Sequence, residues 1–261
     1  MKYQVFNDLH FYDIESEDEL ARAKAIKKHA KEEHADVILV VGDILEGGSP
    51  LNHFSFLKSL FGDVKKIVFC LGNHEFAYKN PHEVYSKLLK QQTERMVKVA
   101  KEHIWCLDVV HYVDISPTIR IVGNTLWYDG SMKDYQDQNL LDFAGHRWLD
   151  RTIKDFNPVA ECNKCKHDIL ASVKSAPGDV IMLTHCVPHK ILNAHPTPSE
   201  FTAFSGVSDF LKKMPVGKVK WAVCGHTHKP SIGHTIHGIN CVNVGYDTNV
   251  GDPIQSFTFE L

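Results

Sequence analysis

The chain has no long hydrophobic run: nothing in its 261 residues approaches the roughly 18 consecutive apolar residues that a membrane-spanning helix needs. Its first ten residues, MKYQVFNDLH, become polar too early to form the apolar core of a signal peptide. It also lacks a strong net charge, because a value of −3 gives no electrostatic case for wrapping nucleic acid or for attachment to a membrane. We therefore expect a cytoplasmic protein that has no membrane partner.

A disulfide framework is also lacking. The seven cysteines are odd in number and scattered through strand-like segments, so we expect reduced thiols. Cys162 and Cys165 have the spacing of half a zinc knuckle, but no second half follows, which favours free thiols there too. Histidine, in contrast, is abundant at 17 residues, and imidazole is the commonest metal ligand in proteins. The positions of the histidines along the chain therefore decide whether they can form a metal site.

Strand-like and helix-like segments alternate in the first hundred residues. The β-branched run VILVV at 37–41 predicts a strand buried on both faces, between further strands at 2–6 and 66–71. Ser16 and Glu19 form a capping box, and helical spacing then extends to His34. Two more helices are predicted near 51–61 and 82–102. This order predicts parallel strand pairing and an α/β architecture.

The rest of the chain has shorter predicted strands. The first three are IWCL, VVHYV and TIRIVG, and two later ones, DVIMLTH and KVKWAVCGHTH, return to the sheet. The last part of the chain resembles an antiparallel closing set, made of SIGHTI, a His237-Gly238 turn, INCVNVG and IQSFTFE. Residues 129–174 are polar and mostly helix-compatible, without a strong strand. No internal repeat or low-complexity linker is evident. We expect a single domain, 1–261, with a cap-like insertion around 129–174.

Polar side chains follow five of the predicted strands, where ligands bind in open α/β sheets. The seven candidate ligands among them are Asp8, His10, Asp43, Asn73, His185, His226 and His228. Residues two apart on an extended chain point the same way, so within the Asp8/His10 and His226/His228 pairs the side chains should converge. Seven oxygen and nitrogen donors without a thiolate are too many for one ion but suit two ions bridged by a carboxylate. Glycines at 42, 72 and 225 would let the backbone approach this centre closely.

The ordered motifs D-x-H, G-D, G-N-H-E, a lone H and G-H-T-H, from Asp8 to His228, resemble those of the calcineurin-like metallophosphoesterase superfamily. The resemblance implies a four-layer α/β/β/α sandwich, with two central mixed sheets flanked by helices and a dinuclear site at the C-terminal ends of strands. It implies one metal ion held by Asp8, His10, Asp43 and His228, and a second held by Asp43, Asn73, His185 and His226. Asp43 would bridge the ions. His74 would be the catalytic residue: it would lie near the leaving-group oxygen without binding metal, as a general acid or as a hydrogen-bond donor to the transition-state phosphoryl group.

Two departures from the family pattern indicate which branch of the superfamily the chain resembles. The second block often continues as G-D-x-x-D, with the last carboxylate orienting the histidine of the third block, but Glu46 occupies that position here. Its longer side chain can still reach His74. The block GDILEGG has no arginine, unlike that of the phosphoprotein phosphatase branch. GNTLWYD and VNVGY are more similar to small bacterial and phage members.

The resemblance predicts a phosphoesterase that hydrolyses phosphate mono- or diesters by in-line attack of a metal-bound hydroxide. Its substrate would be a nucleotide or another small phosphoester, and its cofactors two Mn²⁺ or Fe ions, with Zn²⁺ or Ni²⁺ as alternatives. A nuclease that processes nucleic-acid ends is a second reading, which the mild acidity and the lack of a basic, aromatic stripe disfavour. A non-catalytic metal-binding scaffold is a third, which the presence of His74 disfavours.

Overall fold

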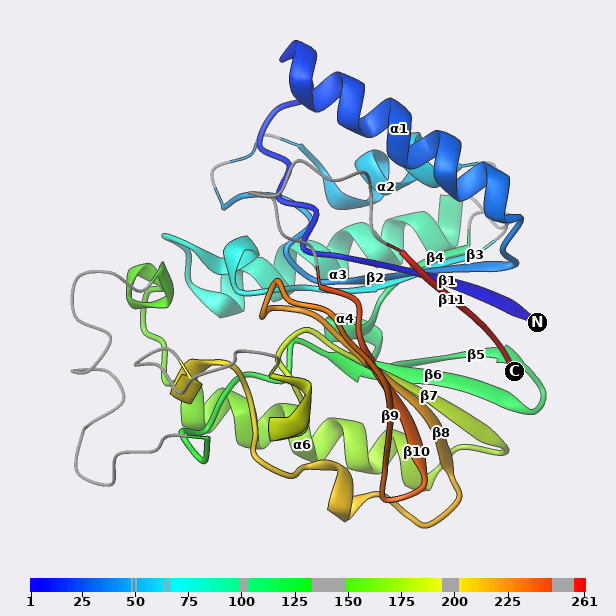
Figure 1. Ribbon diagram of the computed structural model, residues 1–261. Coiled ribbons are helices and arrows are strands. Elements are labelled where there is room, and N and C mark those ends of the chain that lie inside the picture. The colour runs from blue at the N-terminus through cyan, green and yellow to red at the C-terminus, as the bar shows by residue number, and fades with distance from the viewer. Residues whose placement is uncertain are drawn as a thin grey trace.

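The computed structural model describes residues 1–47, 49, 51–62, 64, 66–98, 103–132, 149–193, 202–245 and 256–261. Within them, two mixed β-sheets pack face to face between layers of helices (Figure 1). The strand order is β11-β1-β2-β3-β4 in the first sheet and β5-β6-β7-β8-β10-β9 in the second. The expected four-layer sandwich is therefore confirmed.

The first sheet is mostly parallel. It consists of β1 (Lys2–Asn7), β2 (Val37–Val41), β3 (Lys66–Cys70), β4 (His103–Cys106) and β11 (Phe257–Glu260). Strands β1 to β4 run parallel, as the alternation of strands and helices predicts, and β11 pairs antiparallel with β1. The carboxyl ends of the parallel strands therefore meet at one end of the molecule, opposite the two chain termini (Figure 1).

The second sheet combines a parallel centre with antiparallel edges. It consists of β5 (Tyr112–Ser116), β6 (Ile119–Asn124), β7 (Asp179–Thr184), β8 (Val219–Cys224), β9 (Ser231–Ile236) and β10 (Ile239–Asn243). Strands β6, β7, β8 and β10 are parallel, whereas β5 and β9 run antiparallel to β6 and β10. The hairpin predicted at His237-Gly238 is confirmed as the β9–β10 turn.

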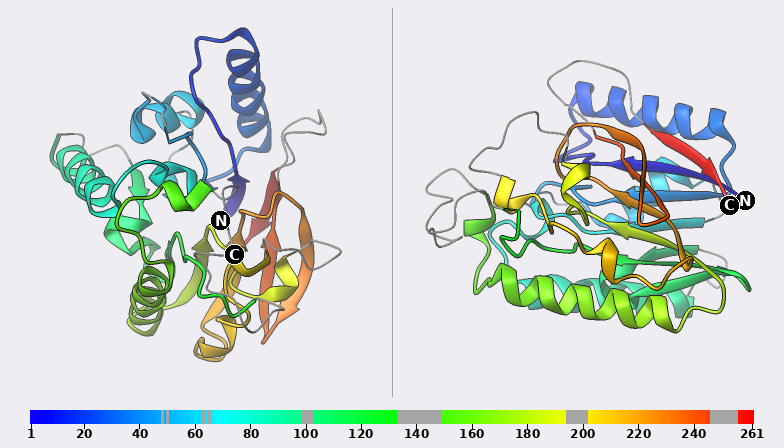
Figure 2. Two further views of the ribbon diagram at one scale, coloured as in Figure 1. Left: turned by 90° about the vertical axis from the view of Figure 1, so that its left-hand side faces the viewer. Right: turned by 60° about the horizontal axis from the view of Figure 1, so that its bottom comes forward.

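Helices cover the outer face of each sheet (Figures 1 and 2). They are α1 (Glu17–Glu33), α2 (His53–Phe61) and α3 (Pro81–Lys98) on the first sheet, and α6 (Pro158–Lys174) on the second. Half of the capping box before α1 is confirmed, because the Ser16 side chain accepts a hydrogen bond from the Glu19 backbone N–H at 3.3 Å. The Glu19 carboxylate accepts instead from the backbone N–H groups of Tyr12 and Asp13. The helix ends at His34, which adopts the left-handed conformation.

Strand β2 shows how both faces of a central strand are buried. Val37, Leu39 and Val41 belong to the hydrophobic core between the two sheets. Ile38 and Val40 belong to the core between the first sheet and its helices. Because side chains alternate across a strand, the unbroken apolar run VILVV supplies both cores at once. The prediction of a strand buried on both faces is thus confirmed.

Two expectations about the second half of the chain are wrong. In VVHYV, Val109 and Val110 end a short helix, α4 (Leu107–Val110), and the strand begins only at Tyr112. The helix carries the chain from the first sheet to the second, so an extended segment cannot continue there. The last strand, β11, joins β1 in the first sheet rather than the β9–β10 hairpin. The alternating apolar and polar residues of β11 fit the edge of either sheet, so the sequence does not show which sheet the strand joins.

Helix α6 lies within the expected insertion, and it packs on the outer face of the second sheet (Figure 1). Residues 133–148, the middle of that insertion, lie outside the described residues, so the cap-like insertion stays a prediction. All seven cysteines are free and buried, as expected for reduced thiols. Cys162 and Cys165 lie on the buried side of α6 and belong to the core.

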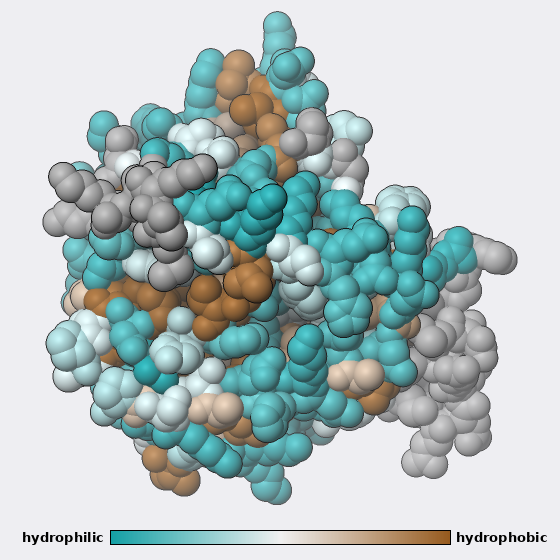
Figure 3. All heavy atoms as spheres, turned by 180° about the vertical axis from the view of Figure 1, so that it is seen from behind, coloured by the Kyte–Doolittle hydropathy of each residue, from teal (hydrophilic) through white to brown (hydrophobic). Residues whose placement is uncertain are grey.

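Seen from behind, hydrophilic side chains cover most of the described surface, and apolar side chains gather only in limited areas (Figure 3). Among the described helices, none has both the length and the apolar character needed to cross a membrane.

Asp108, the second residue of α4, ties the two sheets together. Its Oδ2 accepts a hydrogen bond from the backbone N–H of Leu71 at 2.7 Å. Its Oδ1 accepts two more from the backbone N–H and the hydroxyl of Thr125, both at 2.8 Å. Leu71 follows β3 in the first sheet and Thr125 follows β6 in the second. One carboxylate therefore joins the two sheets at the end where the candidate ligands lie.

Replacing Asp108 with alanine should lower the free energy of unfolding by about 2–4 kcal/mol, because it leaves buried donors of Leu71 and Thr125 without an acceptor. Urea denaturation followed by circular dichroism measures the change. Asp179→Ala is the matched control, because Asp179 forms an exposed ion pair with Lys220 at 3.6 Å, a contact worth less than about 1 kcal/mol. Equal losses in the two variants would contradict the role given to Asp108.

Candidate metal centre

The structure brings all seven candidate ligands together at the carboxyl ends of the strands. Figure 2, left, looks onto this end of the molecule. Four of the ligands follow strands of the first sheet and three follow strands of the second: Asp8, His10, Asp43 and Asn73 belong to the first set, and His185, His226 and His228 to the second. The centre therefore lies where the two sheets meet.

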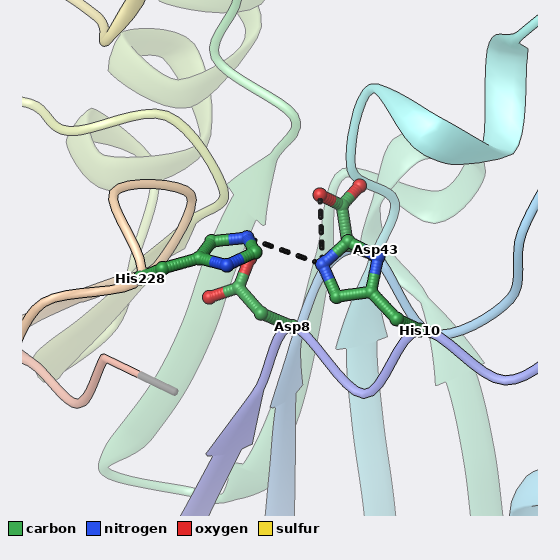
Figure 4. A group of neighbouring side chains, drawn as sticks. All are labelled: Asp8, His10, Asp43 and His228. Atoms are coloured by element: carbon green, nitrogen blue, oxygen red, sulfur yellow. Dashed lines mark hydrogen bonds and ion pairs between the residues drawn. The ribbon is translucent and has the colours of Figure 1, made fainter. Parts of the chain in front are cut away.

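The first cluster consists of Asp8, His10, Asp43 and His228, whose ligand atoms lie within 4.8 Å of one another (Figure 4). Nε2 of His10 lies 3.2 Å from Nε2 of His228 and 3.8 Å from Oδ2 of Asp43. Nε2 of His228 also lies 3.7 Å from Oδ1 of Asp8. This grouping is the one that the family resemblance implies for the first ion.

The second cluster forms around Asp43, His185 and His226. Nε2 of His185 lies 3.3 Å from Oδ2 of Asp43, 3.1 Å from Nδ1 of His226 and 3.0 Å from Oδ1 of Asn73. Asp43 thus belongs to both clusters, and its carboxylate lies between them. The Asn73 side chain completes the set that the resemblance implies for the second ion.

The hydrogen bonds on the far side of the imidazole rings test whether these residues fit a cation. Nδ1 of His185 faces the Val41 carbonyl at 3.1 Å, and Nε2 of His226 faces the Phe204 carbonyl at 3.0 Å. Burial lowers the pKa of His185, but Asp43 outweighs it and raises the pKa to about 9, and a bound cation acts in the opposite direction. A carbonyl only accepts, so in the neutral rings these two nitrogens carry the protons. The nitrogens that face each other 3.1 Å apart then both carry lone pairs. Metal-binding histidines have this arrangement, because their second nitrogen donates to a carbonyl or a carboxylate.

The first cluster repeats the pattern with a carboxylate. Nδ1 of His10 lies 2.8 Å from Oε1 of Glu46, so in the neutral ring it donates its one proton there and leaves Nε2 with a lone pair toward His228. Lone pairs that converge in this way repel one another unless a cation lies between them. The donor set in each cluster therefore fits a divalent metal ion.

The two carboxylates of the centre are almost completely buried, at 0% exposed for Asp8 and 1% for Asp43. Burial raises the pKa of Asp8, although the neighbouring His185 and His228 act in the opposite direction. Burial acts on Asp43 as well, but His185 and His74 outweigh it and hold the pKa of that carboxyl well below its usual range. Two carboxylates enclosed this closely need positive charge beside them.

The backbone turns sharply at each strand exit. Five of the seven candidate ligands have φ between 47° and 70°, in the left-handed region: Asp8, His10, Asp43, His226 and His228. Asp and His tolerate this region better than most residues, yet each such residue costs of order 1–3 kcal/mol. The expected extended geometry is therefore wrong for both pairs. His226 and His228 consequently point into different clusters instead of converging on one point.

Glycine at positions 42 and 72 makes room for the ligands, as expected. A Cβ atom at position 42 would lie 2.2 Å from Nδ1 of His185, and position 42 has a φ of +74°. A Cβ atom at position 72 would lie 2.1 Å from Oδ1 of Asp43. Both distances are far below van der Waals contact, so a side chain at either position displaces a candidate ligand.

His74 lies beside the first cluster. Its Nδ1 lies 2.9 Å from Oε2 of Glu46, and its Nε2 lies 3.9 Å from Oδ2 of Asp43. Glu46 therefore accepts from His10 with one oxygen and from His74 with the other, and these hydrogen bonds lower its pKa to about 2. Burial lowers the pKa of His74, but Asp43 and Glu46 outweigh it and raise the pKa to about 10. A cation bound beside Asp43 acts in the opposite direction.

Glu75 has a structural role that the sequence pattern did not predict. Its carboxylate is buried and accepts three backbone N–H groups: Gly72 at 2.6 Å, Leu45 at 2.8 Å and Asp43 at 3.1 Å. It thereby joins the turn after β2 to the turn after β3. Its position inside the G-N-H-E motif was the available signal, but a carboxylate aimed at the backbone does not differ in sequence from one aimed at a metal.

Comparisons with known proteins agree with this geometry. The family model described as calcineurin-like phosphoesterase matches residues 1–230. The chain belongs to this family, whose members are metal-dependent phosphoesterases. A comparison with curated proteins finds no match to the sequence.

Solved structures with the same fold include three proteins of low sequence identity. The phosphopantetheinyl hydrolase PptH from Mycobacterium tuberculosis is 18% identical and has a TM-score of 0.67, over 94% of this chain and 89% of its own. A dimetal phosphatase from Danio rerio is 15% identical, with a TM-score of 0.56 over 99% and 91%. The protein TT1561 of Thermus thermophilus is 13% identical, with a TM-score of 0.52 over 94% and 89%. At these identities the likeness shows the fold alone.

Replacing Gly72 with alanine should reduce metal uptake at least tenfold, because the new methyl group pushes Asp43 out of both clusters. Elemental analysis of the metal-loaded, desalted protein measures the ions per chain, and thermal unfolding monitors the fold. Gly217→Ala is the control: Gly217 has a φ of +71°, but a Cβ atom there meets nothing within 4 Å. Equal metal content in Gly72→Ala and the wild type would show that Asp43 does not need this space.

Proposed function

We propose that this protein is a dinuclear-metal phosphoesterase that hydrolyses a small phosphoester, such as a nucleotide, by in-line displacement at phosphorus. The observation that carries the proposal is the sharing of Asp43 by two clusters whose imidazole lone pairs face inward. One ion would be held by Asp8, His10, Asp43 and His228, and the other by Asp43, Asn73, His185 and His226. Two bound ions stabilise charge on the phosphoryl oxygens and acidify a water molecule.

The nature of the donors supports the choice of metal. Carboxylate, amide and imidazole ligands without a thiolate suit Mn²⁺ or Fe, with Zn²⁺ or Ni²⁺ as alternatives. The seven cysteines are buried away in the core and are free, which also suits a reducing compartment and supports a cytoplasmic location. We further infer a single-domain enzyme, because both clusters combine ligands from both sheets.

His74 would serve the leaving group. Glu46 fixes its ring by accepting from Nδ1, so Nε2 faces the centre near Asp43. A protonated Nε2 can donate to the departing oxygen and neutralise the charge that develops there. Glu46 also holds His10, so the position of the proton donor is tied to that of one ligand of the first cluster.

A neighbouring cavity supports a small substrate. It has a volume of about 440 Å³, within the range of small-molecule pockets. Leu45 and Glu46 line it from the turn after β2, and Lys79 and Lys87 line it from the other side. Its lining combines these two lysines with the carboxylates of Glu46, Glu75 and Glu83 and with apolar side chains such as Leu45, so its size and its apolar part suit the organic group of a small phosphoester.

The proposal is tested with two chromogenic substrates, bis(4-nitrophenyl) phosphate and 4-nitrophenyl phosphate. The protein is freed of metal, reloaded with Mn²⁺, and compared with the same protein in the presence of a chelator. We expect hydrolysis of at least one substrate with Mn²⁺ and none with chelator, and the ratio of the two rates separates diesterase from monoesterase. A protein that holds two ions and hydrolyses neither substrate would instead be the metal-binding scaffold.

Changing His74 to alanine should lower kcat by roughly 10²- to 10⁴-fold, the range of general acid catalysis, because the leaving oxygen then departs without a proton donor. Metal content should stay near that of the wild type, since His74 is not among the proposed ligands. Steady-state kinetics and elemental analysis on the same preparation measure both. His82→Ala, at an exposed histidine of α3, is the control. Loss of an ion from His74→Ala would show that this residue binds metal.

A further inference from the structure

Asp150 is a buried carboxylate outside the sequence motifs. It lies in η2 (Leu149–Thr152) and is 2% exposed. Its Oδ1 accepts a hydrogen bond of 2.8 Å from Nδ2 of Asn73, and its Oδ2 accepts one of 2.9 Å from the hydroxyl of Tyr128. Burying a carboxylate costs free energy that such hydrogen bonds must offset. Its position directly behind a proposed metal ligand therefore calls for a functional explanation.

The carboxylate decides which end of the Asn73 amide faces the metal centre. An amide group has an accepting oxygen at one end and a donating NH₂ at the other, and an ionised carboxylate can only accept. Asp150 must therefore face the NH₂ end. Oδ1 of Asn73 is left on the opposite side, 3.0 Å from Nε2 of His185. Asp150 is thus the partner that holds the NH₂ end of the amide, on the side away from His185.

The same hydrogen bond changes the ligand strength of the amide. A donor that faces an ionised acceptor forms a stronger hydrogen bond than one that faces a neutral group. This bond draws the amide hydrogens toward Asp150 and leaves more electron density on Oδ1. Carboxylates that accept from a metal ligand in this way raise its basicity. The proposed second ion has one carboxylate ligand, Asp43, which it shares with the first, so this contribution matters most there.

The segment that carries Asp150 is fastened along the loop that carries Asn73. The backbone N–H of Lys154 donates to the carbonyl of Lys79 at 2.9 Å. Nδ2 of Asn80 donates to Oδ2 of Asp155 at 3.0 Å. These contacts hold Asp150 at a fixed distance from the site, although it comes from a part of the chain more than seventy residues away from Asn73.

We propose that Asp150 is the positioning residue of the second ion: it orients and polarises the Asn73 amide so that Oδ1 binds metal. This inference rests on the proposed function, because it assumes that Asn73 is a ligand. It also gives the polar stretch 129–174 a direct part in the metal centre.

The inference is tested by titrating metal-free protein with Mn²⁺ in a calorimeter, which gives the number of ions and their dissociation constants. Asp150→Asn has nearly the same size, so it should fold and keep its thermal unfolding temperature without metal. It should raise the dissociation constant of one ion by roughly 10- to 100-fold and leave that of the other unchanged. Tyr128→Phe, which leaves the carboxylate in place, should have a smaller effect on the same ion.

Asp179→Asn is the matched control, since it makes the same chemical change in the exposed ion pair with Lys220, at the opposite end of β7 from His185. Wild-type binding of both ions in Asp150→Asn would overturn the inference, and so would equal weakening of the two ions or equal effects of Asp150→Asn and Asp179→Asn. A wild type that takes up no ion overturns it as well. Two ions bound without any hydrolysis would contradict the proposed function alone and leave the role of Asp150 standing.

Discussion

The convergence of imidazole lone pairs on a shared carboxylate is the constraint on which the rest of the structure depends. His185 and His226 commit their far nitrogens to backbone carbonyls, and His10 commits its own to Glu46. When these rings are neutral, as metal ligands are, their near nitrogens have no proton to share with one another. Such an arrangement is unfavourable by itself, and the fold maintains it at the cost of left-handed turns at the strand exits. The arrangement therefore lowers the stability of the metal-free fold and raises its proposed affinity for metal.

Carboxylates in three positions organise the site without being proposed ligands. Glu75 holds two strand exits through backbone N–H groups, and Glu46 joins a ligand to His74. Asp150 does for an amide what Glu46 does for imidazole: it accepts from the far end of the group and so fixes the near end. Each of these carboxylates fixes the position of a proposed ligand or of His74 by accepting a hydrogen bond from it or from the backbone beside it. The precision of the centre thus comes from groups that surround the ligands.

The motifs, through the family that they resemble, predicted the fold, and the structure brings together the residues that the resemblance implies for each ion. Their binding of metal stays a prediction. The detailed geometry was not predictable. An alternating pattern indicates an extended exit, but Asp8 and His226 turn into the left-handed region under tertiary contacts. The partner of β11 depends on which sheet edge is free. Asp150 lies in a stretch without hydrophobic periodicity, where nothing links it to Asn73.

The division of ligands between the two sheets has a consequence for stability. Each proposed ion would connect residues that follow strands of opposite sheets, and would act as a cross-link across the core between them. Ligands that bind only the folded state stabilise it by an amount that grows with their free concentration. The unfolding temperature of this protein would then rise with the concentration of free metal, and a chelator would lower it by removing the links between the two sheets.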